Sequence, residues 1–147
     1  MNTTQPARIL VVTDQPDGRP ELLDAIAARA DRGPAQFRVV VTNPARAEAH
    51  LLHPERHEKA AEAEQVLHAS LATITAAARG PVLGSVSVRH DPYLAVEELL
   101  ASEPVDEFII DLTEHGFTRR LHLDLPHRLA HLGLPITQTH SRAATPV

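Results

Sequence analysis

Short runs of aliphatic and β-branched residues alternate along this chain with longer segments of helical periodicity. Two of these runs, Ile-Leu-Val-Val and Arg-Val-Val-Val, are almost continuously apolar, which is typical of strands buried on both faces of a parallel sheet. Parallel strands joined through helices need right-handed crossovers, so the pattern predicts an α/β fold with an open parallel sheet. The predicted strands are Arg8–Thr13, Phe37–Thr42, Gly84–Arg89, Val105–Asp111 and Pro135–His140.

The segments between the strands carry apolar residues three and four positions apart, the spacing of one helix face. Gly80 and Pro81 are a strong stop signal for the second of them. The strand and helix order, β-α-β-α-β-α-β-α-β, predicts a single domain over residues 1–147, with a core of about 8–140 and loose termini. The predicted helices are Pro20–Asp31, Glu55–Arg79, Asp91–Ser102 and a segment from about Asp124 to Leu132, and Asn43–Pro54 is predicted as a loop.

Composition argues against several classes of function. The net charge is −5 and there are only three Phe, one Tyr and no Trp, so a basic stripe with aromatic platforms is absent and no nucleic-acid partner is predicted. The chain has no Cys, which excludes disulfides and thiolate chemistry. Its longest early apolar run, Ile9–Val12, is too short for a signal peptide or a membrane span. A soluble, cytoplasmic protein with no membrane association is therefore expected.

Three segments carry a family resemblance. The run ILVVTD (Ile9–Asp14) is similar to the first strand of universal stress proteins, which ends at an Asp, and His90–Asp111 resembles that family's third helix and fourth strand. The segment DLPHRLAHLGLPITQ (Asp124–Gln138) resembles the family's final helix and last strand. The resemblance spans roughly residues 8 to 140. It implies a doubly wound, Rossmann-like sheet with the strand order 3-2-1-4-5, as in the adenine nucleotide alpha hydrolase-like folds.

The glycine-rich ATP-binding signature of that family is not retained. ATP-binding members carry Gly-x-x-Gly after the fourth strand, then nine residues, then Gly followed by Ser or Thr, and these glycines let backbone N–H groups approach phosphates. Here the first glycine position is Asp111, Gly116 is the only glycine in the following loop, and His122-Leu123 aligns with the final pair. Family members without the signature are generally regarded as not binding ATP. The resemblance therefore implies a divergent member.

Two carboxylates follow strands that should be neighbours. Ligands of open α/β sheets bind outside the carboxyl ends of the strands, where the strand order reverses. Asp14 and Asp111 end the first and fourth strands, so both are expected at that crevice, where they would tolerate a phosphate carried with Mg²⁺. Each Asp could instead simply accept hydrogen bonds from loop N–H groups. The resemblance implies that Asp14 occupies the adenosine-side position and that Val41 lines the base.

Basic residues follow the loop after the fourth strand. Arg119 and Arg120 stand there with Thr113 nearby, and guanidinium groups suit phosphate or carboxylate oxygens. They are candidates for an anion site that replaces the missing glycines; the alternative is a solvated or ion-pairing face. The candidate cofactor-binding residues are thus Asp14, Val41, Asp111, Thr113, Arg119 and Arg120, with ATP as the cofactor to test.

Metal and catalytic motifs give no positive signal. His50, His53 and His57 fall at spacings of three and four, but Pro54 belongs at a helix start and leaves His53 outside, so a surface cluster is predicted. The chain has no Gly-x-Ser-x-Gly, no His-Glu-x-x-His, no Walker loop and no Rossmann glycine fingerprint. The sequence predicts neither a metal site nor a catalytic residue.

The resulting hypothesis is a dimeric, non-catalytic, universal-stress-protein-like domain that responds to or binds a small ligand. Relatives commonly dimerise by pairing their last strands, so the resemblance implies a homodimer through Ile136–His140, an edge with few deterrents to pairing. Two alternatives stay open: a Mg²⁺-dependent ATP-binding switch or weak ATPase that uses Asp14, Asp111 and the Arg119/Arg120 pair, and an interaction module without any small ligand.

Overall fold

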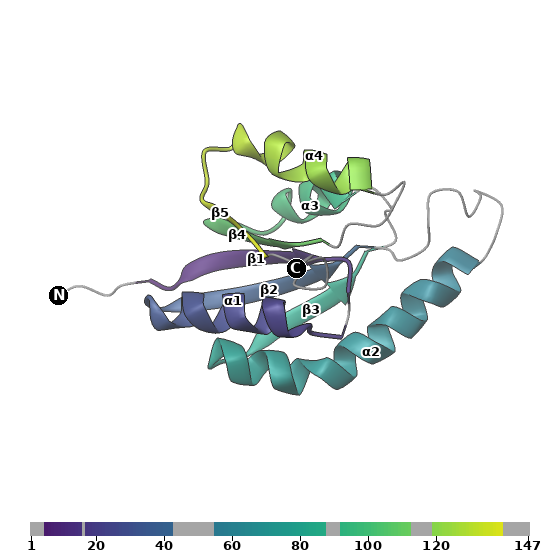
Figure 1. Ribbon diagram of the computed structural model, residues 1–147, viewed down its shortest axis with the longest axis horizontal. Helices are drawn as coiled ribbons and strands as arrows, with labels where there is room; N and C mark the ends of the chain where they lie inside the picture. Colours follow the sequence, from purple (N-terminus) through teal and green to yellow (C-terminus); the bar gives the residue numbers. More distant parts are fainter. Residues whose placement is uncertain (1–4, 16, 43–54, 88–91, 113–118, 140–147) are drawn as a thin grey trace, which may run out of the picture.

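The chain folds as strands alternating with helices around a five-stranded parallel sheet of order β3-β2-β1-β4-β5, which confirms the predicted fold class and strand order (Figure 1). The computed structural model describes residues 5–15, 17–42, 55–87, 92–112 and 119–139, with 55–60 and 119–124 described as backbone only. The elements in chain order are β1 (Ala7–Thr13), α1 (Pro20–Asp31), β2 (Ala35–Val41), α2 (Glu55–Ala78), β3 (Val82–Val86), α3 (Pro92–Leu100), β4 (Glu107–Asp111), α4 (Arg119–Ala130) and β5 (Ile136–Gln138).

The helices form two layers, one on each face of the sheet. From β1 the chain steps outward to β2 and β3, then returns past β1 to β4 and β5. Right-handed crossovers in these two opposite directions place α1 and α2 on one face and α3 and α4 on the other, as Figure 1 shows. The direction changes between β1 and β4, so the switch point of the fold lies between these two central strands.

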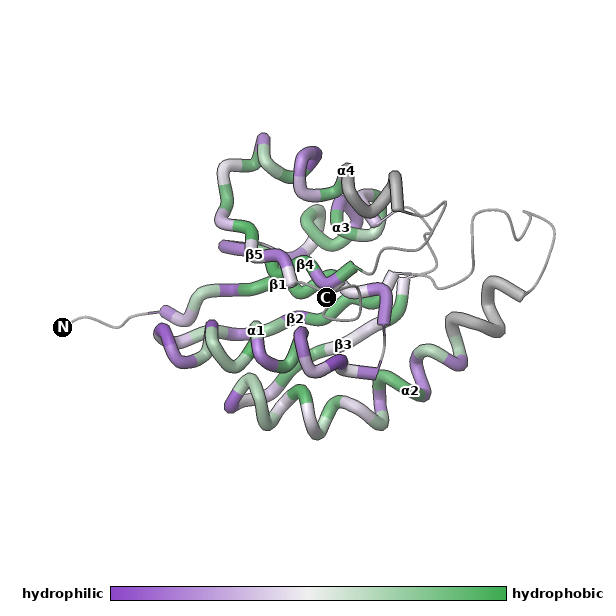
Figure 2. The backbone as a smooth tube through the Cα atoms, in the orientation of Figure 1, coloured by the Kyte–Doolittle hydropathy of each residue, from purple (hydrophilic) through white to green (hydrophobic). Residues whose placement is uncertain are grey.

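Alternation along β1 shows why its sequence is continuously apolar. Ile9 and Val11 belong to the core under α1 and α2, whereas Leu10 and Val12 belong to the core under α3 and α4. All four side chains are buried, because helices cover both faces of this strand. Figure 2 shows the same distribution, with hydrophobic stretches along the central strands and hydrophilic ones on the outer sides of the helices.

Each face has its own anchoring contacts. On the first face, Arg29 of α1 donates from Nε to a carboxylate oxygen of Glu107 in β4 at 3.0 Å, and both side chains are mostly buried. On the second face, Phe108 of β4 packs with Val96 of α3 and Leu125 and Leu129 of α4. These contacts fix α1 and α4 on opposite sides of β4. Among the described helices, none combines the length and the apolar character that crossing a membrane requires.

Most element boundaries differ from the sequence-based prediction by one or two residues, and the starts of β3 and α4 are the differences with a clear physical reason. Strand β3 covers Val82–Val86 instead of starting at Gly84, because Val82 already pairs with Phe37 and is buried. Gly84 is tolerated inside the strand because α2 packs directly on it, where an added Cβ would meet Leu67 Cδ2 at 3.0 Å.

Helix α4 begins at Arg119, five residues before the predicted start at Asp124, and it contains Pro126 in its interior. A proline favours the first turn of a helix but does not require it, so it was a poor marker of this helix start. The predicted loop 43–54 and the end of the predicted third strand, residues 88 and 89, lie outside the described residues.

An Asp side chain joins the starts of β1 and β4. The Asp106 carboxylate accepts the backbone N–H of Arg8 at 2.8 Å, and the Asp106 N–H donates to the Arg8 carbonyl at 2.7 Å. The backbone hydrogen bond, followed by the hydrogen bond and charge of the Arg8 side chain, lowers the pKa of Asp106.

We therefore expect Asp106→Asn to lower stability at neutral pH. Because the folded-state pKa of Asp106 is lowered, its contribution is complete above the ordinary Asp pKa of about 3.9 and is lost as the pH falls through the folded value. Urea unfolding of the wild type and the variant should give different midpoints at pH 7 and midpoints that converge as the pH falls below the ordinary Asp pKa. The same substitution at Asp24, an exposed residue of α1, is the control; an equal effect there would contradict the assignment.

Candidate functional site

The carboxyl ends of β1 and β4 lie side by side, and their last residues, Thr13 and Asp111, are paired in register. The backbone N–H of Asp14 donates to the carbonyl of Asp111 at 3.3 Å, which extends this contact by one residue. Because the strand order reverses here, this is the edge at which open α/β sheets hold their ligands. The candidate site is therefore built on these two strand ends.

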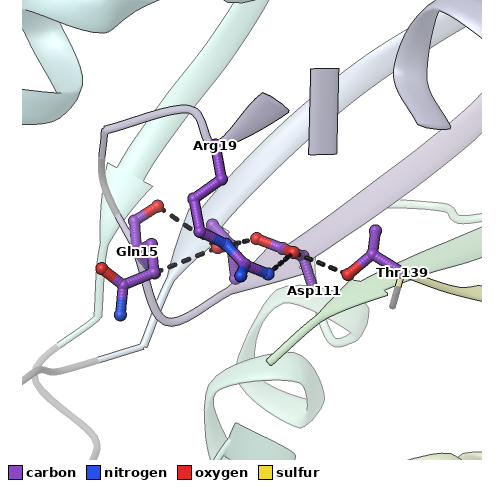
Figure 3. A network of polar contacts seen from close by, with 5 residues as sticks. Gln15, Arg19, Asp111 and Thr139 are labelled. Carbon is purple, nitrogen blue, oxygen red and sulfur yellow. Dashed lines mark hydrogen bonds and ion pairs between the residues drawn. The ribbon is translucent and has the colours of Figure 1, made fainter. Parts of the chain in front are cut away.

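A buried carboxylate stands at the centre of this edge. The Asp111 side chain is 0% exposed, and both of its oxygens accept hydrogen bonds from the chain itself (Figure 3). Thr13 donates from Oγ1 to Oδ2 at 2.7 Å, and Thr139, just after β5, donates from Oγ1 to Oδ1 at 2.7 Å. The Nη2 of Arg19 forms an ion pair with Oδ1. We call Thr13, Arg19, Asp111 and Thr139 the switch-point network.

The loop between β1 and α1 positions the cation of this network. Arg19 immediately precedes helix α1, whose first residue is Pro20, and a residue before proline is confined to extended conformations. Its backbone is accordingly extended, with ψ 150°, and its carbonyl accepts the first helical hydrogen bond from Leu23 at 3.0 Å. The side chain makes no helix-capping hydrogen bond and points toward Asp111 instead (Figure 3).

The Thr13 hydroxyl extends the network to the first residues of the loop. It accepts the backbone N–H of Gln15 at 3.0 Å while it donates to Asp111. A second contact from the hydroxyl, to the carbonyl of Gln15, is longer at 3.2 Å. One side chain therefore holds both the carboxylate and the loop that carries Arg19.

The charges at this edge stabilise one another. Burial acts to lower the pKa of Arg19, but the hydrogen bond and charge of Asp111, with smaller contributions from Glu21 and Asp14, outweigh burial and raise it. The guanidinium is therefore held in its charged form by carboxylates on several sides.

Burial makes this ion pair more consequential than a surface pair. The Arg19 side chain is 16% exposed and that of Asp111 is fully buried. Removing one partner of a buried pair leaves an uncompensated charge and costs about 3–5 kcal/mol, far more than the 0–1 kcal/mol typical of an exposed pair. The switch-point network is thus a condition for the fold at this edge as well as a feature of the candidate site.

Three of the predicted site residues lie at this edge of the sheet. Asp14 follows β1 and is partly buried, and Val41 ends β2 and is fully buried in the core under α1 and α2. Asp111 ends β4, as predicted, but its carboxylate is engaged with Thr13, Arg19 and Thr139. The structure therefore brings Asp14 and Asp111 together, as the topology argument predicts, and gives Asp111 internal partners.

The other three predicted residues follow β4. Thr113 lies outside the described residues. Arg119 and Arg120 are the first two residues of α4, described as backbone only. Their proposed role in anion binding stays a prediction.

Sequence reasoning missed Arg19, Thr13 and Thr139. One signal could have found Arg19: a carboxylate at the end of a buried strand needs a partner at the same sheet edge. The loop after β1 reaches that edge, and Arg19 is its only basic residue. The two threonines gave no signal of their own, because threonine is common at strand ends for its β-propensity alone.

Within the described ranges, no group of three His, Asp or Glu side chains lies close enough to hold a metal ion. Of the histidine cluster considered from sequence, His50 and His53 lie outside those ranges and His57 is described as backbone only.

Comparison with known proteins gives no assignment for this site. No protein-family model matches the chain, and no curated protein matches it.

We expect Arg19→Met to destabilise the protein by about 3 kcal/mol, because it leaves the Asp111 carboxylate buried without a cation. The double variant Arg19→Met with Asp111→Asn should recover more than half of that loss, since it removes the uncompensated charge. Urea unfolding at pH 7 measures both. Arg79→Met, at an exposed arginine paired with Asp31, is the matched control and should cost little. If the double variant loses as much unfolding free energy as Arg19→Met and Asp111→Asn lose separately in total, the two residues are not coupled, and the assignment is contradicted.

Proposed function

We propose that this chain is a universal-stress-protein-like regulatory domain that acts by binding, not by catalysis, and that does not use a nucleotide triphosphate at its switch point. The observation that supports the proposal most directly is the switch-point network. At the position where the resembling family has the first glycine of its ATP-binding signature, this chain has Asp111, fully buried and hydrogen-bonded on both oxygens.

A side chain at this position works against phosphate binding in two ways. A glycine leaves space for phosphate oxygens to reach backbone N–H groups, and a carboxylate occupies that space. The carboxylate also takes the place of a phosphate as the anion that pairs with Arg19. A bound triphosphate would have to displace Asp111 from Arg19 or accept its repulsion.

The network retains a feature suited to a smaller ligand. The Nε of Arg19 is buried and has no hydrogen-bond partner among the described residues. An oxygen of a small ligand that enters after a local rearrangement would satisfy this donor at less electrostatic cost than a triphosphate. This feature supports the small-ligand part of the proposal.

We expect calorimetric titration of the wild-type protein with ATP to give no binding heat, with or without Mg²⁺. The reason is that the cation nearest the strand ends is already paired with Asp111. A nucleotide that stays bound through purification would also suppress the heat. Denaturing the protein releases such a nucleotide, and its absorbance near 260 nm is easily detected because the chain has one Tyr and no Trp.

The alternative, a Mg²⁺-dependent nucleotide switch or weak ATPase, is favoured by one arrangement: Asp14 follows β1 and Val41 ends the neighbouring β2, the positions that the resemblance assigns to the adenosine side. It predicts a micromolar dissociation constant, about −8 kcal/mol of binding free energy. It also predicts that Arg120→Ala weakens binding while Arg79→Ala, at an exposed residue of the α2–β3 turn, does not. That pair of results would replace the proposal with the switch.

We also propose that the chain forms a homodimer through its last strand, predicted from sequence as Ile136–His140. Strand β5 lies at one edge of the sheet, and its described residues are Ile136–Gln138; His140 lies outside the described residues. Thr139 donates its N–H to Ile110, and the carbonyl of Pro135 accepts from Phe108. Along a parallel strand, successive residues direct their N–H and C=O groups alternately to one side and the other. Residues 135 and 139 face β4, so Ile136 and Gln138 direct their backbone groups to the outer edge.

We expect Gln138→Pro to convert the dimer into a monomer. Proline at residue 138 removes an outward N–H and leaves the β4–β5 ladder intact, because the inward donors belong to the neighbouring residues. Sedimentation at tens of micromolar, a concentration at which an edge-strand dimer with a micromolar constant is assembled, measures the mass. Gln138→Thr is the control and should remain dimeric. A wild-type monomer under these conditions would remove this part of the proposal.

A further inference from the structure

Strand β3 forms the other edge of the sheet. It pairs with β2 on one side, and in the described part of the chain no strand lies on its other side. Ser87 donates its N–H to the carbonyl of Val41 at 2.8 Å. By the alternation of a parallel ladder, Val82, Gly84 and Val86 direct their N–H and C=O groups outward. These groups are a template for an additional strand.

Helix α2 borders the space next to this edge. A groove of about 630 Å³ runs between the helix and the strand, lined by Ala61, Glu64, Gln65, Leu67, His68, Leu71, Gly84 and Ser85. Of these helix residues, Leu67 is buried in the core with Ile74 and Ala78, and Leu71 packs against that core. The other four, Ala61, Glu64, Gln65 and His68, are exposed. Figure 1 shows α2 running below and outside β3. The helix therefore forms one wall of a strand-sized space.

Gly84 and Leu83 give this edge apolar contacts on both faces. Leu67 and Leu71 of α2 pack directly over Gly84, where a Cβ would meet them at 3.0 Å and 3.3 Å, and they form an apolar wall of the groove. On the opposite face, Leu83 is 71% exposed, the most exposed large hydrophobic residue of the described chain. The strand reads Val-Leu-Gly-Ser-Val and has no charged residue or proline, the features that protect edge strands from pairing.

We propose that the β3 edge binds an extended peptide segment of another protein, which adds to the sheet as a sixth strand. Such binding takes its affinity from main-chain hydrogen bonds and its specificity from pockets for alternate side chains. Here an apolar side chain of the peptide lies beside Gly84, in the groove against Leu71, and its neighbour covers Leu83. A basic residue of the peptide lies toward Glu64, the acidic residue that lines the groove. This proposal does not depend on the function proposed for the switch point.

A second copy of this chain fits the edge less well. Antiparallel pairing of two β3 strands about a two-fold axis would place both α2 helices on the same face of the joined sheet, so both would need the strand-wide space that each borders. Helices pack with their axes 8–10 Å apart, roughly twice the spacing of neighbouring strands. Pairing centred on Gly84 would also set glycine against glycine and leave the groove unfilled. A lone extended segment avoids both problems.

The test uses the full chain and a blocked synthetic peptide of seven residues, alternating valine and threonine with an arginine at each end. Nitrogen-15 NMR titration should shift the backbone amides of Val82, Gly84 and Val86. The Val86→Pro variant loses one outward N–H while keeping the inward ladder, so binding should weaken about fivefold. No amide shifts along β3, or shifts confined to β5, would overturn the proposal.

A charge-reversal pair tests the orientation independently of the proline variant. Glu64→Lys should weaken the arginine-ended peptide about threefold, as expected for loss of an exposed ion pair, and should favour a glutamate-ended peptide instead. Glu62→Lys makes the same charge change on the same helix at an exposed position outside the groove. Equal effects of the two variants would show nonspecific attraction and overturn the proposal. Shifts of the β3 amides on raising protein concentration alone, with a dimer mass, would assign the edge to a second copy and overturn it as well.

Discussion

The buried ion pair between Arg19 and Asp111 is the interaction on which the arrangement of this sheet edge depends. A carboxylate with no exposed surface is tolerated only if its oxygens are hydrogen-bonded and its charge is balanced. Here the partners come from three places: the end of β1, the loop before α1 and the residue after β5. One side chain therefore ties the switch point, the first crossover and the last strand together.

The buried ion pair occupies the space that a ligand at this edge of the sheet would need. Open α/β sheets bind ligands where the strand order reverses because backbone N–H groups and diverging loops leave a crevice there. In this chain the crevice between β1 and β4 contains a carboxylate and a guanidinium that satisfy each other. Because Arg19 and Asp111 already neutralise each other, the site is suited to a small ligand or to no ligand at all. The two edge strands of the sheet, β3 and β5, are the other candidate contact surfaces.

The two borders differ in ways that suit different partners. Strand β5 is three residues long and leaves Thr137 and Gln138 exposed, so a short, symmetric pairing matches it. Strand β3 is five residues long, uncharged, and bordered by the flank of α2. In the proposal for this edge, that flank leaves room for one extended segment but not for another large domain. The shape of the helical layer, rather than the composition of the strands alone, separates the two edges.

Local patterns determined most of the fold. Apolar runs and helical periodicity identified the alternating strands and helices and placed α1 at Pro20–Asp31, because these signals arise from neighbours in sequence. The strand order was implied by the family resemblance and is confirmed by the structure. Boundaries set by long-range packing were less accurate: β3 gained Val82 from its pairing with Phe37. The sequence also placed Asp111 at the switch point. Only the tertiary structure supplied its partners, because Arg19 and Thr13 are 92 and 98 residues away and a buried charge selects its counter-ion in space.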